Sequence, residues 1–401
     1  MRLAAVRQIQ IFNAGREPER LAMKYRAMRA STFAFLRGSC HLFYDRLPSG
    51  GVFKTAPAVW VCGDLHLENF GSYKGDNRQV YFDVNDFDES ALAPASWDLV
   101  RFLTSLQVGL EGMALREARV QVLCQAFVEA YASSLASGKA YWVERDTAQG
   151  MVRELLDGLR ARTRVGFLGS RTLVKRGRRL LLADGRKALP VDAAQRAAVE
   201  NFMREFAESQ PQPAFFRVLD VARRVAGTGS LGVDRFAILV QGKGSPDGNY
   251  LLDMKQALPS SLVPHLKLAQ PRWNSEAHRV VELQRRQQAV SMAFLQPVLF
   301  TEAPYVLRAL QPSEDRVRFT GTGRTPSEIE AVVVTMAQML AWAQLRSAGR
   351  DGSATADELI DFGQRRKWKA SLLAASHDCA AQVRQDAAAF NAAFDAGEFG
   401  A

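Results

Sequence analysis

The sequence contains few cysteines and histidines and no long hydrophobic run. Its four cysteines lie far apart in the 401-residue chain, and none belongs to a C-x-x-C pair. This spacing argues against a thiolate zinc site or a disulfide framework, and it suits a reducing cytosol. No run reaches the roughly 18 apolar residues of a membrane span, and the N-terminal stretch lacks the apolar core of a signal peptide. We therefore expect a cytoplasmic protein that has no membrane partner.

The sequence also has fewer acidic than basic residues, with 42 aspartates and glutamates against 52 lysines and arginines. The resulting net charge of +10 favours anionic partners such as nucleotides or phosphorylated substrates. The densest basic segment, residues 174–187, alternates with leucine and contains an Asp-Gly pair, so we interpret it as a basic hairpin. It has no interleaved aromatic residues and no zinc-finger or RNA-binding pattern, which favours a solvated hairpin over a nucleic-acid partner.

The chain divides into three segments of different character, and together they predict an α+β fold. Residues 1–210 are mainly helical, apart from two apolar strands between 57 and 86 that flank a polar loop and a turn. Residues 211–311 begin with a proline-containing break and have the apolar runs, glycine pairs and turns of a β-rich lobe. Residues 312–401 are predicted to form a mainly helical tail.

The polar loop after the first apolar strand, "GDLHLEN", has the residue spacing of a kinase catalytic loop. Asp64 and Asn69 are five residues apart, as in the pattern D-x-x-x-x-N. In that role Asp64 accepts the proton of an acceptor hydroxyl, and Asn69 binds a metal ion through its amide oxygen. The following cluster, "NDFDES", offers Asp86 to bridge the metal to the phosphates and Asp88 as a second ligand or a structural partner. Hard oxygen ligands of this kind predict Mg²⁺ rather than zinc.

The letters "GDLH" also resemble the opening of calcineurin-like metallophosphoesterases, which is an alternative interpretation of the same loop. Those two-metal sites need a later Gly-Asn-His and further histidine ligands. The chain has five histidines in all, and none of them lies in such a motif. The shortage of histidine therefore disfavours a phosphoesterase.

A glycine-rich loop, "GTGSLG", contains three glycines in G-x-G-x-x-G spacing. In a dinucleotide-binding fold a helix follows these glycines, whereas here the strand-like "VDRFAILVQG" follows them. Strand, glycine loop and strand is the arrangement in which kinase backbone N–H groups cover the phosphates of ATP. We expect ATP to bind through the loop residues Gly227, Thr228, Gly229, Ser230 and Gly232.

Lys255, in the next predicted strand "NYLLDMKQA", occupies the place of the kinase lysine that binds the α- and β-phosphates. Such a lysine needs an ion-pair partner to hold its long side chain. Glu282 in the following predicted helix is placed to be that partner, and Glu276 is the second candidate.

Two further residues are candidates for the site. Arg37 lies among apolar residues in "FLRGS" and is a candidate for contact with a phosphate, or for a structural ion pair with Asp98 or another carboxylate. His66 lies between Asp64 and Asn69, and a structural role in orienting Asp64 or its loop is favoured over proton transfer.

The motifs together resemble those of the aminoglycoside phosphotransferase and choline kinase branch of the protein kinase-like superfamily. The resemblance rests on "GDLHLEN", the acidic "DFD" and the later "WDL", whose Asp98 fits the position of an aspartate that anchors the helical lobe. Cys62 stands where that branch usually has histidine, so one supporting hydrogen bond is expected to be weaker.

The chain as a whole resembles the bacterial domain-of-unknown-function 2252 family, from about residue 20 to residue 348. The stretches that carry this resemblance are "FAFLRGS", "GDLHLENFG", "NDFDES", "WDLVR", "GTGSLGVDRF", "DMKQA", "RVVELQ" and "YVLRAL". Such proteins tend to have a histidine in an Ala-His-Ala context where this chain has Gln344. The resemblance implies a kinase-like fold and no established substrate.

The predicted nucleotide-binding elements come after the catalytic loop, which reverses the order of an ordinary kinase. We therefore expect a two-lobed, circularly permuted kinase-like fold, which is feasible because chain termini are often close together at the surface. The expected function is ATP–Mg²⁺-dependent transfer of phosphate to an unidentified hydroxyl-bearing small molecule. Transfer of AMP on the same fold is one alternative, and an ATP-binding pseudokinase is another. A basic nucleic-acid binder is a third alternative, with steep dependence on salt.

Overall fold

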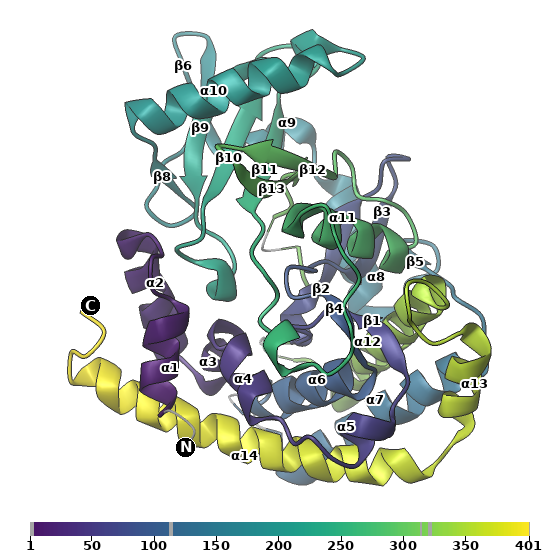
Figure 1. The fold of residues 1–401 in the computed structure, drawn as a ribbon. Helices are drawn as coiled ribbons and strands as arrows, with labels where there is room; N and C mark the ends of the chain where they lie inside the picture. The colour runs from purple at the N-terminus through teal and green to yellow at the C-terminus, as the bar shows by residue number, and fades with distance from the viewer. Residues whose placement is uncertain (1–3, 112–114, 313–314, 320–322, 401) are drawn as a thin grey trace.

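The computed structural model describes residues 4–111, 115–312, 315–319 and 323–400, which form a mixed α+β structure (Figure 1). A six-stranded sheet lies above a larger, mainly helical portion in the view of Figure 1. Within the described ranges, every helix is too short or too polar to cross a bilayer. The predicted α+β class is confirmed.

The six-stranded sheet is antiparallel throughout and carries the glycine-rich loop. Its strands in spatial order are β12 (Gln296–Phe300), β13 (Ala303–Ala309), β11 (Tyr250–Gln256), β10 (Arg235–Val240), β9 (Val218–Arg224) and β8 (Ala188–Pro190). Helix α10 (Ala193–Glu208) covers one face, where its Val199 and Met203 pack with Leu252 and Met254 of β11. Because side chains alternate along a strand, Lys255 points to the opposite face.

The segment that builds this sheet begins before residue 211. Strand β8 and helix α10 both belong to it, and the predicted boundary at 210/211 falls between α10 and β9. Helix α10 begins where the sequence predicted, with Asp192 and Gln195 in a capping box that satisfies backbone N–H groups at the first turn.

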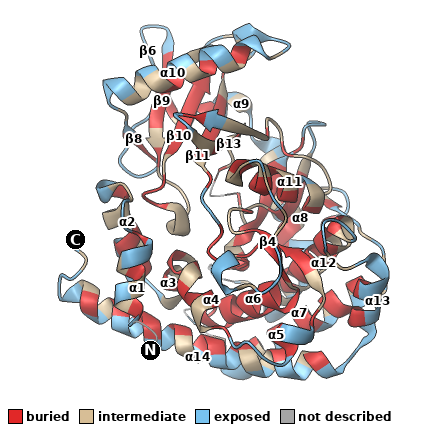
Figure 2. Ribbon diagram, in the orientation of Figure 1, coloured by how far each residue is buried: buried red, intermediate tan, exposed pale blue. Residues whose placement is uncertain are grey.

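The helical portion is built around helix α6, which is buried over almost its whole length (Figure 2). Helices α7 and α14 pack against α6, and α12 packs against α7. Helix α14 also contacts the N-terminal helices α1, α2, α3 and α5. The helices of this portion are α1 (Ala5–Phe12), α2 (Pro18–Arg29), α3 (Thr32–Gly38), α4 (Cys40–Arg46), α5 (Val52–Thr55), α6 (Ser96–Gly109), α7 (Glu117–Ala136), α8 (Gly150–Ala161), α12 (Pro326–Ser347), α13 (Ala356–Gln364) and α14 (Lys367–Asp395).

Two small antiparallel sheets bring the two acidic motifs together. One consists of β1 (Ala58–Val61) and β4 (Ala91–Pro94); the other consists of β2 (Phe70–Lys74), β3 (Val80–Val84) and β5 (Val143–Glu144). Val61 pairs with Ala91, so the loop that follows β1 starts beside the end of the loop that precedes β4. Phe70 pairs with Val84, and the Asn85 backbone N–H donates to the Asn69 carbonyl at 3.0 Å. Strand pairing therefore aligns the two loops at both ends.

The basic hairpin that the sequence predicted is present, although its turn lies elsewhere. Strands β6 (Thr172–Lys175) and β7 (Arg178–Leu181) are joined by Arg176 and Gly177, both with positive φ. A two-residue hairpin requires such φ values, and glycine adopts them without steric cost. The Asp184–Gly185 pair forms a separate loop before β8, in which the Asp184 carboxylate accepts from three backbone N–H groups.

The remaining elements connect the two portions. They are helix α9 (Arg164–Gly169), which precedes the hairpin, and helix α11 (Glu276–Gln287), which lies between β11 and β12. Helix α11 contacts β12 and β13 of the sheet as well as α12 of the helical portion.

Candidate functional site

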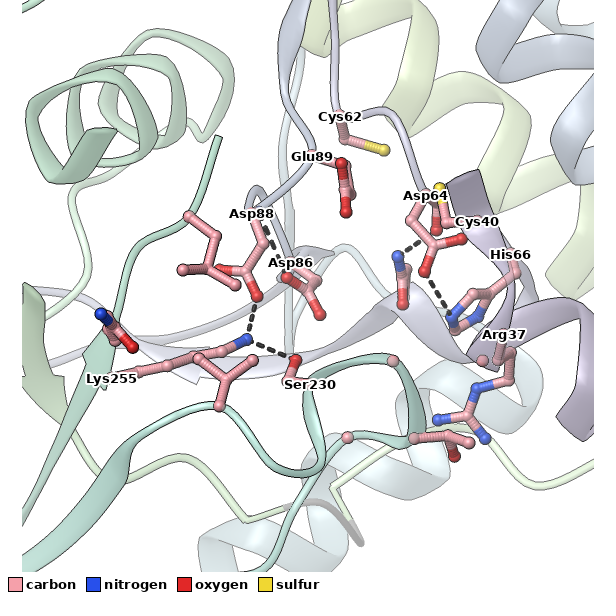
Figure 3. Close-up of a pocket in the computed structure, with 18 of the residues that line it drawn as sticks. Arg37, Cys40, Cys62, Asp64, His66, Asp86, Asp88, Glu89, Ser230 and Lys255 are labelled. Atoms are coloured by element: carbon pink, nitrogen blue, oxygen red, sulfur yellow. Dashed lines mark hydrogen bonds and ion pairs between the residues drawn. The ribbon is translucent and has the colours of Figure 1, made fainter. Parts of the chain in front are cut away.

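A cleft between the six-stranded sheet and the helical portion brings together residues from both predicted motifs (Figure 3). It contains about 830 Å³ of empty space, its open mouth included. Its lining includes these predicted site residues: Arg37, Asp64, His66, Asn69, Asp86, Asp88, Gly227, Thr228, Gly229, Ser230 and Lys255. Acidic residues from the first hundred positions therefore face the glycine-rich loop across one cavity.

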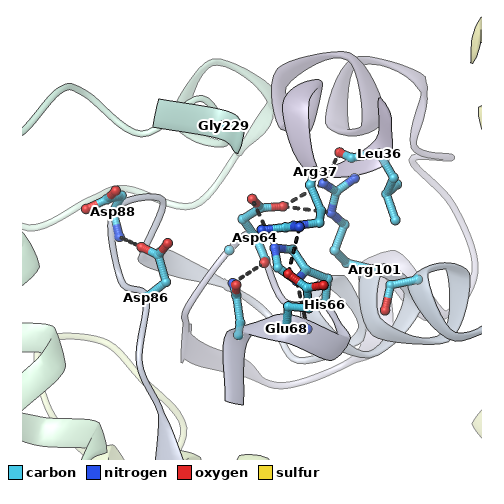
Figure 4. A network of polar contacts seen from close by, with 12 residues as sticks. Leu36, Arg37, Asp64, His66, Glu68, Asp86, Asp88, Arg101 and Gly229 are labelled. Carbon is cyan, nitrogen blue, oxygen red and sulfur yellow. Dashed lines mark hydrogen bonds and ion pairs between the residues drawn. The ribbon is translucent and has the colours of Figure 1, made fainter. Parts of the chain in front are cut away.

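Asp64 is held by a buried arginine that the sequence did not single out. The Arg101 guanidinium donates to Asp64 Oδ1 through Nε at 3.1 Å and Nη2 at 2.6 Å, and Nη2 also donates to the Leu36 carbonyl at 2.6 Å (Figure 4). Burial raises the pKa of Asp64 to about 6, although the Arg101 charge opposes this shift. A carboxylate fixed in orientation, with a pKa near neutrality, is suited to accept a proton.

His66 stays neutral beside Asp64. Its Nδ1 accepts from the Glu68 backbone N–H at 3.1 Å, which assigns the proton of the neutral ring to Nε2. Nε2 lies 3.9 Å from Asp64 Oδ2, beyond hydrogen-bonding distance. Burial lowers the pKa of His66 well below its usual value, and the charges of Arg37 and Arg101 lower it further. These contacts agree with a structural role for His66.

Asn69 is oriented by the loop that carries Asp64. Its Nδ2 donates to the Asp64 backbone carbonyl at 2.5 Å. Because the amide nitrogen is used in this way, the oxygen Oδ1 is the atom that is available to a cation.

Asp98, which the resemblance placed as an anchor of the helical lobe, holds the start of the same loop. The completely buried carboxylate accepts from the Cys62 N–H at 2.9 Å and the Gly63 N–H at 3.0 Å. Burial raises the pKa of Asp98 to about 6, although these backbone hydrogen bonds oppose the shift. Gly63 has a φ of +90°, and a Cβ there would lie 2.2 Å from the Glu89 carbonyl oxygen. Only glycine allows this close approach between the two loops.

The acidic loop after β3 is held by helix α11. Arg279 Nη2 donates to the Asp88 carbonyl at 2.9 Å, and Nη1 donates to the Ser90 carbonyl at 2.5 Å. The Asp86 carboxylate accepts weakly from the Asp88 N–H at 3.4 Å. Glu89 accepts from the Ser261 N–H at 2.6 Å. This bonding leaves the side chains of Asp86 and Asp88 at the cleft surface (Figure 3).

A dedicated protein cage for a metal ion is absent from the described part of the chain, where no cluster of three or more His, Cys, Asp or Glu has a suitable arrangement. Asn69, Asp86 and Asp88 nevertheless line one cleft. Mg²⁺ usually binds proteins through one or two carboxylates and completes its shell with water and substrate phosphates. The donor set fits Mg²⁺ that arrives with a phosphorylated ligand.

The glycine-rich loop has a defined conformation, held by two cationic side chains from the N-terminal segment. Gly227 and Gly232 have φ values of +77° and +87°, so both positions favour glycine. The Gly229 carbonyl accepts from Arg16 Nη1 at 2.7 Å and from Lys24 Nζ at 3.1 Å. Ser230 turns its hydroxyl toward the sheet, where it accepts from Lys255 Nζ at 2.6 Å.

Lys255 connects the sheet to the acidic loop. It lies opposite Arg235 on β10, and its Nζ forms an ion pair with Asp88 Oδ2 (Figure 3). Burial lowers the pKa of Lys255 to about 8, and the charge of Asp86 acts in the opposite direction. Lys255 therefore interacts electrostatically with the carboxylates of both Asp86 and Asp88.

The structure does not bring Glu282 to Lys255. Glu282 is 42% exposed at its side chain and pairs with Arg285 at 3.5 Å within its own helix. Glu276 pairs with Arg279 at 2.6 Å. The buried face of α11 presents Arg279 to the acidic loop, and Asp88 is the carboxylate that reaches Lys255.

Arg37 forms its ion pair with Glu68, at 2.7 Å, and not with Asp98. Arg316, from the segment after β13, approaches the same Glu68 oxygen at 2.6 Å. Neither Glu68 nor Arg316 was a sequence candidate, because no local spacing connects them. Gln344 is buried on α12, where it accepts from the Tyr131 hydroxyl at 2.5 Å.

The comparisons with known proteins agree with the family resemblance. The family model described as "Uncharacterized protein conserved in bacteria (DUF2252)" matches residues 16–393, so the chain belongs to this family. No curated protein and no solved structure that was compared with the chain matches it.

Proposed function

We propose that this protein is an ATP–Mg²⁺-dependent phosphotransferase that acts on a hydroxyl acceptor, with a kinase-like fold in permuted order. One observation carries the proposal. Asp64, Asn69 and Asp86 line the same cleft as the glycine-rich loop and Lys255, although the two groups are far apart in sequence. A phosphotransferase needs this combination, because one ATP–Mg²⁺ complex must contact both.

The proposed reaction assigns a separate task to each side of the cleft. The glycine-rich loop and Lys255 bind the phosphates of ATP, and Asn69 and Asp86 bind the Mg²⁺ that neutralises their charge. Asp64 accepts the proton of the acceptor hydroxyl while the hydroxyl oxygen bonds to the γ-phosphorus. The bond between the γ-phosphorus and the β,γ-bridging oxygen breaks, and ADP leaves with that electron pair. Positioning and electrostatics carry most of such a reaction.

The ion pair between Lys255 and Asp88 is compatible with this assignment. Lys255 has Asp88 and Ser230 as partners, and phosphate oxygens are stronger acceptors than a hydroxyl. We expect Lys255 to exchange Ser230 for phosphate oxygen when nucleotide binds.

The proposal is tested by a transfer assay on a pool of metabolites with γ-labelled and α-labelled ATP. Wild type is compared with Asp86→Ala and with Asp76→Ala, which removes an exposed carboxylate from the neighbouring hairpin. We expect label from the γ position in a product with wild type and Asp76→Ala, and a loss of roughly 100-fold with Asp86→Ala. Equal labelling by all three proteins would contradict the proposal.

AMP transfer is a second candidate, favoured by a specific observation. A second group of cations, Arg37 and Arg316, lies on the Asp64 side of the cleft and could hold phosphates of a nucleotide bound in the opposite direction. A product labelled only from the α position would identify this reaction. Mg–ATP binding without any labelled product would identify an ATP-binding pseudokinase.

A further inference from the structure

Two arginines from distant parts of the chain share one carboxylate at the Asp64 end of the cleft. Arg37 on α3 and Arg316 after β13 each place Nη1 within 2.7 Å of Glu68 Oε2. Arg316 is positioned by an antiparallel backbone bridge with Gly71 of β2. Both arginines line the cleft together with Asp64 and Asn69.

This end of the cleft has more positive than negative charge. Arg37, Arg101 and Arg316 face only two carboxylates, Asp64 and Glu68, in the contacts that the described residues form there. His66 adds no charge, since burial and these same arginines keep the ring neutral. A buried excess positive charge is costly unless an anion balances it.

Arg37 also has unused capacity for hydrogen bonding. Its side chain is 14% exposed, and its guanidinium lies 5.6 Å from the centre of the Phe33 ring. Its Nε is fully buried and has no hydrogen-bond partner among the described residues. A planar guanidinium with an unused donor, next to a second guanidinium, is suited to carboxylate or phosphate oxygens.

The Arg37 side chain lies at the opposite end of the cleft from Lys255, although the glycine-rich loop approaches the Arg37 backbone at Gly229. Figure 3 shows Lys255 and Asp88 at one end of the cleft and His66 and Arg37 at the other, with Asp64 and Asp86 between them. Figure 4, from another direction, shows Asp86 and Asp88 on one side of Asp64 and Arg37 and His66 on the other. An anion at the arginines would therefore lie beyond the base, on the side from which an acceptor approaches.

We propose that Arg37 and Arg316 bind an anionic group, carboxylate or phosphate, on the hydroxyl acceptor, and so restrict the substrates to hydroxylated acids or phosphate esters. This inference rests on the proposed phosphotransferase function. The end of the cleft with Arg37 and Arg316 then selects the acceptor. Glu68 competes with the anionic group for the same two guanidinium groups.

The test is calorimetric titration with inorganic phosphate of protein saturated with Mg²⁺ and a non-hydrolysable ATP analogue, which occupies the Lys255 side. We expect Arg316→Ala to weaken phosphate binding about tenfold or more and to leave the affinity for the analogue unchanged. Arg318→Ala, which removes an exposed arginine two residues away, should leave both affinities unchanged. Glu68→Gln should strengthen phosphate binding, because it removes the competing carboxylate. A merely structural ion pair does not predict that gain.

Three results would decide against the inference. Phosphate binding that Arg316→Ala and Arg318→Ala affect equally would overturn it. So would weaker phosphate binding in Glu68→Gln. A parallel loss of analogue binding in Arg316→Ala would assign the arginines to the nucleotide instead.

Failure of the proposed function has a different signature: wild type would not bind the analogue, while phosphate binding would still depend on Arg316. If Arg316→Ala does not fold, Arg37→Lys replaces it in the test. This variant keeps the positive charge but loses the planar guanidinium that binds two oxygens at once.

Discussion

Lys255 forms an ion pair with Asp88 across 167 positions of sequence, and this contact joins strand β11 to the acidic loop after β3. The lysine is almost fully buried, whereas the Asp88 side chain is 34% exposed. The pair thus connects the six-stranded sheet to the helical portion at the centre of the cleft. It also keeps a buried cation next to the proposed phosphate site.

Removal of Asp88 should destabilise the protein because it leaves Lys255 buried without its carboxylate. We expect Asp88→Asn to lower the free energy of unfolding by about 1 to 2 kcal/mol, a figure reduced for the partial exposure of Asp88. Lys255→Met should cost less in the Asp88→Asn background than in wild type. Urea denaturation of the two single variants and the double variant measures the coupling free energy.

The matched control for this cycle is the surface pair Arg384 and Glu111, whose side chains are 47% and 37% exposed. Its coupling free energy should be close to zero, because solvent screens exposed charges. Equal coupling in the two cycles would show that the Lys255 contact is an ordinary surface interaction.

Gly63 should tolerate no side chain, for two reasons that can be separated. Its φ of +90° is unfavourable for other residues, and an added Cβ would collide with the Glu89 carbonyl oxygen. We expect Gly63→Ala to lower the free energy of unfolding by about 3 kcal/mol or more, since backbone strain and a clash act together. Thermal or urea unfolding measures this loss.

Gly177 provides the control for the strain alone. It has a φ of +74° in the β6–β7 turn, and an added Cβ there would have no atom within 4 Å. Gly177→Ala should cost about 1 kcal/mol. If the two substitutions cost the same, close approach of the loops at Gly63 is not what requires glycine.

Asp98 should raise the free energy of unfolding, because its carboxylate accepts hydrogen bonds from two buried backbone N–H groups. Asp98→Ala leaves the Cys62 and Gly63 N–H groups buried without an acceptor, so we expect a loss of about 2 to 4 kcal/mol in urea unfolding. Asp192→Ala, which removes the exposed N-cap of α10, should cost only about 1 kcal/mol. A smaller loss for Asp98→Ala than for Asp192→Ala would contradict the anchoring role.

Local spacing in the sequence was sufficient to predict several parts of the site. Asp64 and Asn69 meet because they share one loop, and the capping box at Asp192 follows from residues three positions apart. Hydrophobic patterns likewise predicted α11, β1 and β3, but not β2, which lies partly in a segment expected to be a turn. Each of these features depends on residues a few positions apart, where chain geometry limits the outcomes.

The ion-pair partners could not be predicted in the same way. Lys255 was expected to pair with Glu282, yet its partner is Asp88, because α11 turns Arg279 toward the acidic loop. Arg101 and Arg316 reach their carboxylates across distances in sequence that no local pattern encodes. Such contacts depend on how the two portions of the fold pack, and several carboxylates compete for each cation.

His41 should make the protein sensitive to mild acid. Its ring stacks on Phe12 with a centroid separation of 3.8 Å, and both ring nitrogens are buried without a hydrogen-bond partner among the described residues. Burial lowers the pKa of His41 well below its usual value, and the nearby charges of Lys24, Arg16, Arg101 and His265 lower it further. The folded protein therefore keeps His41 neutral, whereas the unfolded chain binds a proton below a pH of about 6.5.

Because the unfolded state binds more protons in this range, the free energy of unfolding falls as the pH drops below about 6.5. One such histidine contributes a slope of at most about 1.4 kcal/mol per pH unit. His41→Phe keeps a ring that can stack on Phe12 and removes the titrating group. We expect it to reduce the slope of stability against pH between about 5 and 7, measured by urea unfolding at each pH. His377→Phe, at an exposed position, should leave the slope unchanged, and equal slopes in all three proteins would mean that His41 takes up a proton in the folded state.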